Sequence, residues 1–146
     1  MLIRLFNTLI AALILLGISN TASAQIITIN VGGSNGSENY IQVYEYDAVT
    51  VKPCFPGGEE KLTDFINTHR QYPKAAYDKG IQGTVSCWFI VNTDGSVSNI
   101  SIRKSISALL DNEAVRIFSL MPKWSPGRIN GMAVPVRVFR SVKFRK

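Results

Sequence analysis

The sequence predicts an α+β fold, in which two main helices pack on one face of a short antiparallel three-stranded sheet. Three observations support this prediction. Apolar residues recur at helical spacing in two separate stretches, residues 59–69 and 110–121. Two strand-like runs flank the turn dipeptide Asp94-Gly95. A third alternating run covers residues 134–144, close to the C-terminus.

The first helix is predicted over residues 59–69. Glu59 and Glu60 lie at its start, where negative side chains interact favourably with the helix dipole. Its apolar face has the three- and four-residue spacing of a helix, and its members are Leu62, Phe65, Ile66 and His69. A short helical piece follows in "YPKAAYDKG", where Pro73 suits a first turn and Gly80 a C-terminal cap.

The second main helix precedes the last strand, and Asp111 suits its first turn. Its apolar face comprises Leu110, Ala114, Ile117, Phe118 and Met121. The two helices therefore each present one apolar stripe to a common core.

The clearest hairpin pattern lies on either side of Asp94-Gly95. The inward-facing residues are Val85, Cys87, Phe89 and Val91 before the turn and Val97, Ile100 and Ile102 after it. The step from Val97 to Ile100 breaks the period of two, so a β-bulge is predicted near Ser98-Asn99.

The last strand places its apolar residues on one face, namely Val134, Val136, Val138, Val142 and Phe144. Pro135 lies near its start and has no N–H for a neighbouring strand, so we expect the strand to lie at least partly at a sheet edge. An edge of this kind is either protected or paired by another chain. A proline in place of Val138 is expected to block such pairing.

The N-terminal residues 1–24 combine a basic Arg4, an apolar run from Leu5 to Ile18 and the small residues before Gln25. This pattern is typical of a signal peptide cleaved after Ala24, and the alternative is an uncleaved inner-membrane anchor. Residues 25–54 are interpreted as an extended, flexible lead-in, and residues 55–146 as the folded domain. Cleavage would leave fifteen basic and ten acidic residues, a net charge of +5, and export makes nucleic acid an improbable partner.

Candidates for chemistry are few. His69 belongs to an apolar helix face, and no cluster with metal-ligand or catalytic-triad spacing accompanies it. Ser101 and Lys104 match a Ser-x-x-Lys pattern, but residues three apart in a strand point to opposite faces. Cys54 and Cys87 would form a disulfide in an oxidising compartment, or Cys87 would be a small buried apolar residue. We therefore predict neither an enzyme nor a cofactor or metal.

Several separated signatures resemble the C-terminal domain of TonB, in the version common in Bacteroidetes. They are the Tyr72-Pro73 pair, the strand and turn from Gly83 to Gly95, the helix start "LDNEA" and the segment "MPKWSPG". The resemblance extends from Phe55 to the C-terminus. It implies a periplasmic adaptor domain that binds a peptide segment of an outer-membrane TonB-dependent transporter as an added β-strand, in nutrient transport.

The resemblance also implies a site. In the family the transporter peptide pairs along the last strand, which here gives an interface of Ala133, Val134, Val136, Arg137, Val138, Phe139 and Arg140. Arg137 and Arg140 would face an acidic or polar peptide. Tyr72 and Pro73 match a family motif near the transporter contact and form the second part of the expected site.

The chain departs from full energy transducers, which combine this domain with an uncleaved membrane helix and a long proline-rich spacer. We therefore expect a stand-alone adaptor without its own energy coupling, anchored in a membrane only if residues 1–24 are retained. The alternative is a self-associating structural cell-envelope protein, in which a second copy fills the open edge and forms a homodimer. A hydrolase is a formal third hypothesis, tested by mutating Ser101.

Overall fold

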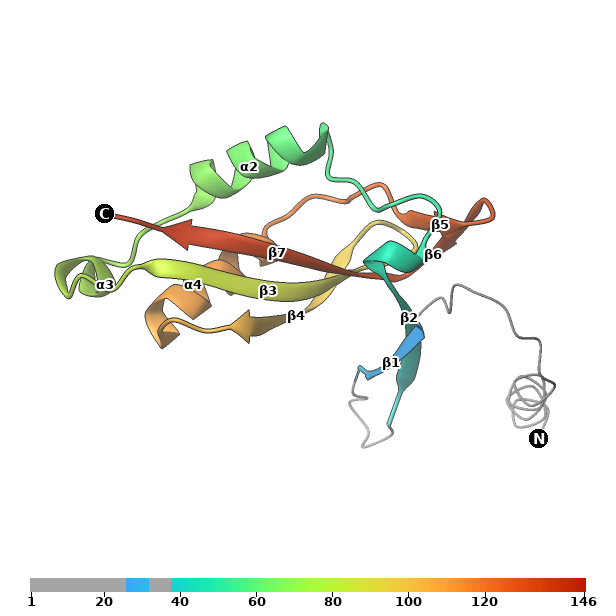
Figure 1. Ribbon diagram of the computed structural model, residues 1–146, viewed down its shortest axis with the longest axis horizontal. Coiled ribbons are helices and arrows are strands. Elements are labelled where there is room, and N and C mark those ends of the chain that lie inside the picture. The colour runs from blue at the N-terminus through green and yellow to red at the C-terminus, as the bar shows by residue number, and fades with distance from the viewer. Residues whose placement is uncertain (1–25, 32–37) are drawn as a thin grey trace.

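The computed structural model describes residues 26–31 and 38–146. The predicted signal peptide lies outside these residues. The elements are β1 (Ile26–Asn30), β2 (Tyr40–Glu45), the 3₁₀ helix η1 (Tyr46–Ala48), α2 (Gly58–His69), α3 (Lys74–Asp78), β3 (Gly83–Val91), β4 (Val97–Lys104), α4 (Ala108–Ser119), β5 (Gly127–Ile129), β6 (Met132–Val134) and β7 (Val136–Phe144) (Figure 1). None of the helices in the described ranges has the length and hydropathy of a membrane span.

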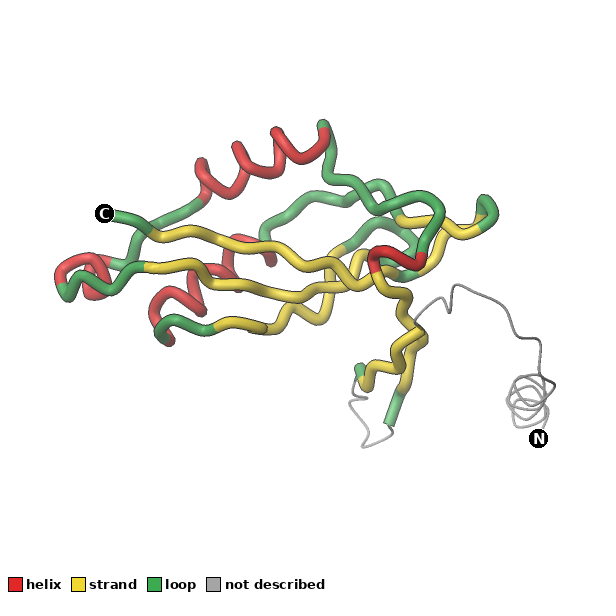
Figure 2. The backbone as a smooth tube through the Cα atoms, viewed as in Figure 1, coloured by secondary structure: helices red, strands yellow, loops and turns green. Residues whose placement is uncertain are grey.

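The main sheet has the strand order β1-β2-β7-β3-β4, and β5 and β6 form a separate two-stranded ribbon. The predicted three-stranded antiparallel unit is present as β7-β3-β4, with β3 and β7 paired over nine residues. The sheet is larger than predicted because β1 and β2, which lie in the expected flexible lead-in, add two strands. β2 joins β7 in parallel through two residue pairs only. Figure 2 shows the β1–β2 hairpin pointing away from the long axis of β3, β4 and β7.

Both main helices pack into one core, as predicted. α2 contributes Leu62, and α4 contributes Leu110, Ala114, Ile117 and Phe118. The inward residues of the strands are those predicted, with Val85, Cys87, Phe89 and Val91 on β3 and Val136, Val138, Val142 and Phe144 on β7. Burial of these aliphatic and aromatic side chains holds the helices against the sheet, since each stabilises the fold by roughly 1.5 to 3 kcal/mol.

The predicted bulge is confirmed. Trp88 pairs with Ser101 and Ile90 with Ser98, so two residues of β4 lie opposite Phe89. Asn99, one of these two, has a φ of 52°. The bulge returns Ile100 and Ile102 to the helix-covered face of the sheet, where both pack against the core.

The hairpin turn contacts the segment before β5. Trp124 is buried and packs edge-on against Phe55 and Phe89. The backbone N–H of Trp124 donates to the carbonyl of Gly95 at 2.8 Å. Gly95 has a φ of 85°, and a Cβ there would lie 2.0 Å from the Trp124 carbonyl oxygen. The Asp94-Gly95 turn and Trp124 therefore fit together only with glycine at this position.

Candidate functional site at the edge of strand β7

One edge of β7 is only partly paired. β2 covers its first two residues, where Tyr44 lies opposite Val136 and Glu45 opposite Arg137. Past Arg137, no strand within the described residues pairs with this edge. β7 is thus interior by strand order but open along most of its length, which agrees with the prediction of a partial edge.

The orientation of the backbone decides which groups the open edge presents. The Pro135 carbonyl accepts a hydrogen bond from the Tyr44 N–H at 2.9 Å, and the Lys143 carbonyl accepts one from Arg70 Nη1 at 2.6 Å. Both carbonyls point away from β3, and backbone direction alternates along a strand. The odd-numbered residues of β7 therefore turn their N–H and C=O groups toward the open edge.

This orientation overturns one expectation from the sequence. Val138 pairs with Phe89 of β3, and as an even-numbered residue it directs its N–H toward β3. A proline there would break the β3–β7 ladder instead of blocking an added strand. Ser141 is the better position, because its N–H faces the open edge.

Two arginines shape the edge. Arg140 Nη1 donates to the Phe139 carbonyl at 2.7 Å, and its guanidinium also forms an ion pair with Glu59 of α2. The same guanidinium lies over the rings of Tyr46 and Trp124, 5.6 and 5.9 Å from their centres. Arg140 thus fills the space between η1 and α2 beside the open backbone.

Arg137 is held in a similar way at the other end of the free edge. Its guanidinium donates to both carboxylate oxygens of Glu45, with 3.3 Å between Nε and Oε2, and lies over the Trp88 ring, 4.0 Å from its centre. The two arginines expected to face a peptide therefore already have carboxylate partners within the chain, at Glu45 and Glu59.

Ala133 and Val134 are placed elsewhere. They belong to β6 and pair with Arg128 and Gly127 of β5. The predicted single last strand is divided at Pro135, which has no N–H with which to continue a ladder. Of the expected interface, Phe139 and Arg140 lie beside the free edge, and Val136 and Val138 are buried in the core.

Tyr72 and Pro73 lie by the far end of β7. The Tyr72 hydroxyl donates to the Ile81 carbonyl at 2.5 Å, and its ring packs edge-on against Phe144. Pro73 precedes the first residue of α3. Tyr72 therefore helps to position the α3 segment on the end of β7 through its own hydrogen bond and ring contact.

An ion pair between the buried Glu113 and the partly exposed Arg116 fixes the chain just before Tyr72. Glu113 of α4 accepts hydrogen bonds from Arg116 and from the Gln71 N–H, and Arg116 Nη2 donates to the His69 carbonyl at 2.6 Å. Burial alone would raise the pKa of Glu113, but the hydrogen bonds from Arg116 and Gln71 hold that pKa below its ordinary value. The carboxylate thus ties the end of α2 to α4.

The sulfur and imidazole groups have ordinary structural environments. Cys54 is exposed and Cys87 is buried, and both are free thiols. Burial, with a smaller contribution from Asp111, raises the pKa of Cys87 to about 11. His69 is half-buried, with Nδ1 2.8 Å from the Phe65 carbonyl oxygen. In the described part of the chain, no group of three or more His, Cys, Asp or Glu side chains could hold a metal ion.

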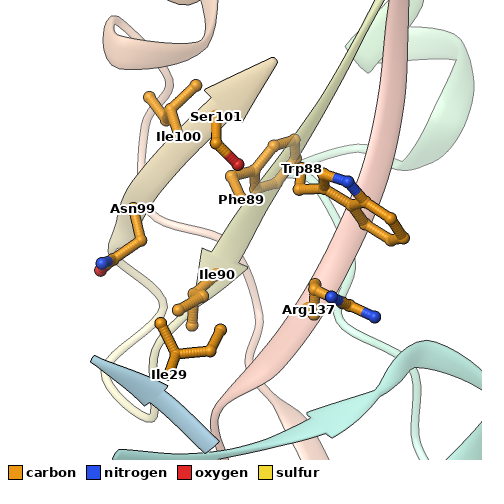
Figure 3. Close-up of a pocket in the computed structure, with 8 residues that line it drawn as sticks. All are labelled: Ile29, Trp88, Phe89, Ile90, Asn99, Ile100, Ser101 and Arg137. Carbon is orange, nitrogen blue, oxygen red and sulfur yellow. The ribbon is translucent and has the colours of Figure 1, made fainter. Parts of the chain in front are cut away.

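The face of the sheet that the helices leave uncovered brings the predicted interface residues Arg137 and Phe139 together with Trp88 and Arg103, which were not among the predicted site residues. Trp88 and Phe139 meet there, with ring centres 5.7 Å apart, and Arg103 lies over both rings. Beside them a groove of about 280 Å³ is lined mainly by apolar side chains, with Arg137 at one side (Figure 3). The sequence signal that could have identified Trp88 as a surface residue is its position on the outward-facing side of an alternating strand.

The family follows from a direct comparison. Residues 68–145 match the family described as Gram-negative bacterial TonB protein C-terminal. The chain belongs to this family. The match confirms the resemblance seen in the sequence, and it includes β7, the open edge and the Tyr72-Pro73 pair, whereas β1 and β2 precede it. The matched region therefore begins at the end of α2 and includes all later elements.

This TonB C-terminal domain is similar to Protein TonB from two strains of Helicobacter pylori, with 39% identity over 54 residues in each case. These matches cover 37% of this chain and 19% of the relatives, so the chain spans about a fifth of their length. Among solved structures, a TonB C-terminal domain of Helicobacter pylori is 26% identical with a TM-score of 0.45, covering 59% of this chain and 90% of that one. The TonB C-terminal domain of Pseudomonas aeruginosa is 24% identical with a TM-score of 0.44, and the match covers 53% of this chain and 78% of that one.

Proposed function

We propose that this chain is a periplasmic TonB-type adaptor that binds a peptide segment of an outer-membrane TonB-dependent transporter as an added β-strand, and so takes part in nutrient transport. The observation that carries the proposal is the unpaired edge of β7 over residues 139–143. Membership of the family supports it, because TonB proteins of Gram-negative bacteria act with such transporters.

The edge suits a short strand. Five residues of extended chain span roughly 17 Å, and the N–H groups of Phe139, Ser141 and Lys143 turn toward the open side. β2 already pairs with the start of β7 in the parallel sense, so this edge accepts a parallel strand. Main-chain hydrogen bonds would supply affinity, and side-chain contacts specificity.

Binding would exchange hydrogen bonds within the chain for hydrogen bonds to the peptide. The Phe139 and Lys143 carbonyls now accept from the guanidinium groups of Arg140 and Arg70, and peptide N–H groups would replace these donors. Each exchange contributes little net free energy, since a hydrogen bond is worth about 0.5 to 1.5 kcal/mol. Arg140, once released, is free to interact with an acidic side chain of the peptide.

The test compares Ser141→Pro with Ser141→Ala. Both variants lose the contact between the Ser141 and Ser86 hydroxyl oxygens, which are 2.9 Å apart, but only proline removes the N–H that faces the open edge. Each protein serves as bait in an envelope extract of the bacterium that carries the gene, and bound proteins are identified by mass spectrometry. Circular dichroism confirms that both variants are folded.

Recovery of outer-membrane transporters by the parent and Ser141→Ala, with a loss of about tenfold or more for Ser141→Pro, would support the proposal. Equal recovery by all three proteins would rule out this edge. If the bait recovers only its own chain and sedimentation shows a dimer that Ser141→Pro abolishes, the edge instead serves self-association in the cell envelope.

A further inference from the structure

The uncovered face of the sheet has a charge pattern that the open edge does not explain. We define the basic-aromatic face as Trp88, Arg103, Lys104, Arg137, Phe139 and Lys143. Lys104 pairs with Ser86 and Lys143 with Thr84, and residues paired across strands share a face. Three neighbouring strands therefore present four cations around two aromatic rings.

Acidic side chains are almost absent from this face. All ten Asp and Glu residues of the chain lie in its described part, and only Glu45 contacts the basic-aromatic face, through Arg137. The others lie on the helices and in the loops and turns: Glu38, Asp47, Glu59, Glu60, Asp64, Asp78, Asp94, Asp111 and Glu113. The helices and loops carry acidic and basic side chains together, in ion pairs such as Lys61–Asp64 and Lys74–Asp78. The basic-aromatic face is instead net positive, and it would attract an anionic partner.

The groove adds an apolar component to this face. Ile29 of β1 and Ile90 of β3 line it, and Trp88 and Arg137 form its side toward β7 (Figure 3). Its volume is about 280 Å³. A concave apolar site beside guanidinium groups suits a ligand that offers an apolar side chain next to a carboxylate.

The N-terminal hairpin shows what this face accepts. β1 places Ile29 at the groove, and β2 places the Glu45 carboxylate on Arg137. An aliphatic side chain and a carboxylate of the chain itself thus cover one end of the face. Arg103 and Lys104 are exposed at the other end, where no carboxylate of the described residues contacts them.

We infer that the basic-aromatic face binds an acidic polypeptide segment that carries apolar side chains, separately from strand addition at the β7 edge. Charge complementarity identifies the partner as acidic, and the groove identifies its apolar part. A polypeptide fits better than an anionic membrane, because membrane-bound surfaces insert protruding aromatic or aliphatic side chains. Here the apolar site is hollow, and Trp88 is half-buried beneath two guanidinium groups.

The experiment uses a fluorescein-labelled peptide of alternating Glu and Leu, and a matched peptide with Gln in place of Glu. The protein is expressed from its full sequence and purified in the form that the cell produces. It is then titrated into each labelled peptide while fluorescence anisotropy is measured. The test variant is Arg103→Gln with Lys104→Gln. The matched control is Lys61→Gln with Lys79→Gln, which removes the same charge from exposed positions on and beside the helices α2 and α3.

We expect the parent and the control variant to bind the Glu-Leu peptide equally well. The test variant should bind it about tenfold more weakly, which corresponds to a loss of about 1.4 kcal/mol in binding free energy. The Gln-Leu peptide should not bind. If thermal unfolding shows that the test variant is misfolded, Lys104→Gln with Lys143→Gln replaces it, since both lysines are exposed.

Three results would overturn the inference. They are equal weakening in the test and control variants, equal binding of the two peptides, and no binding by the parent. A parallel titration with phosphatidylglycerol vesicles addresses the membrane alternative, and vesicle binding that depends on Arg103 and Lys104 without peptide binding would assign this face to lipid. The Ser141→Pro variant should bind the Glu-Leu peptide like the parent, so this site and the β7 edge are tested independently.

Discussion

The Tyr44 N–H donates to the Pro135 carbonyl at 2.9 Å and so joins the N-terminal hairpin to the last strand of the sheet. This bond lies at the end of the edge proposed for partner binding. β2 continues from it for one further residue, Glu45, before η1 leads the chain away. The hairpin therefore occupies the first two residues of an edge that is otherwise free.

Tyr44→Pro should detach β2 without altering β7, because proline removes the N–H that reaches Pro135. Hydrogen exchange should become faster over residues 40–45 and stay unchanged over β3. The lengthened edge should bind the transporter segment more tightly, by about fivefold if one more hydrogen bond forms. Tyr44→Ala keeps the N–H and is the control; equally fast exchange in both variants would show that the side chain, and not this bond, holds the hairpin.

Much of the fold could be predicted from local patterns. The two main helices begin and end within two residues of their predicted limits. The bulge, formed by Asn99 and Ile100, lies within one residue of the predicted Ser98-Asn99, because the inward side chains on both sides of it must face the same core. Where a pattern is set by residues that are neighbours in sequence, it can be seen in sequence alone.

The candidate site was harder to predict because it depends on pairings between distant residues. The run Tyr40–Glu45 is β-prone, but nothing in it specifies β7 as its partner or a register of only two pairs. Arg137 was expected to be available to a partner, and its ion pair with Glu45 spans 92 positions of sequence. Which backbone groups face the open edge is likewise set by the β3–β7 register.

Gly95→Ala should destabilise the domain strongly, because a Cβ would lie 2.0 Å from the Trp124 carbonyl oxygen at a residue with a φ of 85°. We expect a loss of at least about 2 kcal/mol in the free energy of unfolding, or roughly 8 °C or more in Tm. Gly80→Ala is the control, since Gly80 also has a positive φ, of 69°, but nothing lies within 4 Å of its added Cβ. It should cost about 1 kcal/mol. Similar Tm values for the two variants would show that the turn can move away from Trp124.

Glu113→Gln should weaken the connection between α2 and α4, because the amide cannot replace the charged acceptor for Arg116 and the Gln71 N–H. The expected loss is about 1 to 3 kcal/mol near neutral pH, measured by chemical unfolding. Asp64→Asn removes a carboxylate from an exposed ion pair with Lys61 and should have little effect.

The ion pair between Glu113 and Arg116 also predicts that the stability of the domain depends on pH. The pKa of Glu113 is lower in the folded chain than its ordinary value of 4.5, so its stabilising contribution is complete above that value and is lost as the pH falls through the folded pKa. The stability of the parent should therefore decrease more steeply than that of Glu113→Gln below pH 4.5. Parallel curves for the two proteins would mean that other carboxyl groups determine the acid response.

The two thiols should differ sharply in reactivity with iodoacetamide. Cys87 is fully buried and its pKa is raised to about 11, so near pH 8 it is almost entirely in the unreactive thiol form. Cys54 is exposed and should be alkylated readily. Mass spectrometry of the native protein should show one modification, which Cys54→Ser abolishes, and two modifications after unfolding in denaturant. Rapid alkylation of Cys87 in the native Cys54→Ser protein would mean that the face between β3 and α4 opens, because these elements bury the thiol.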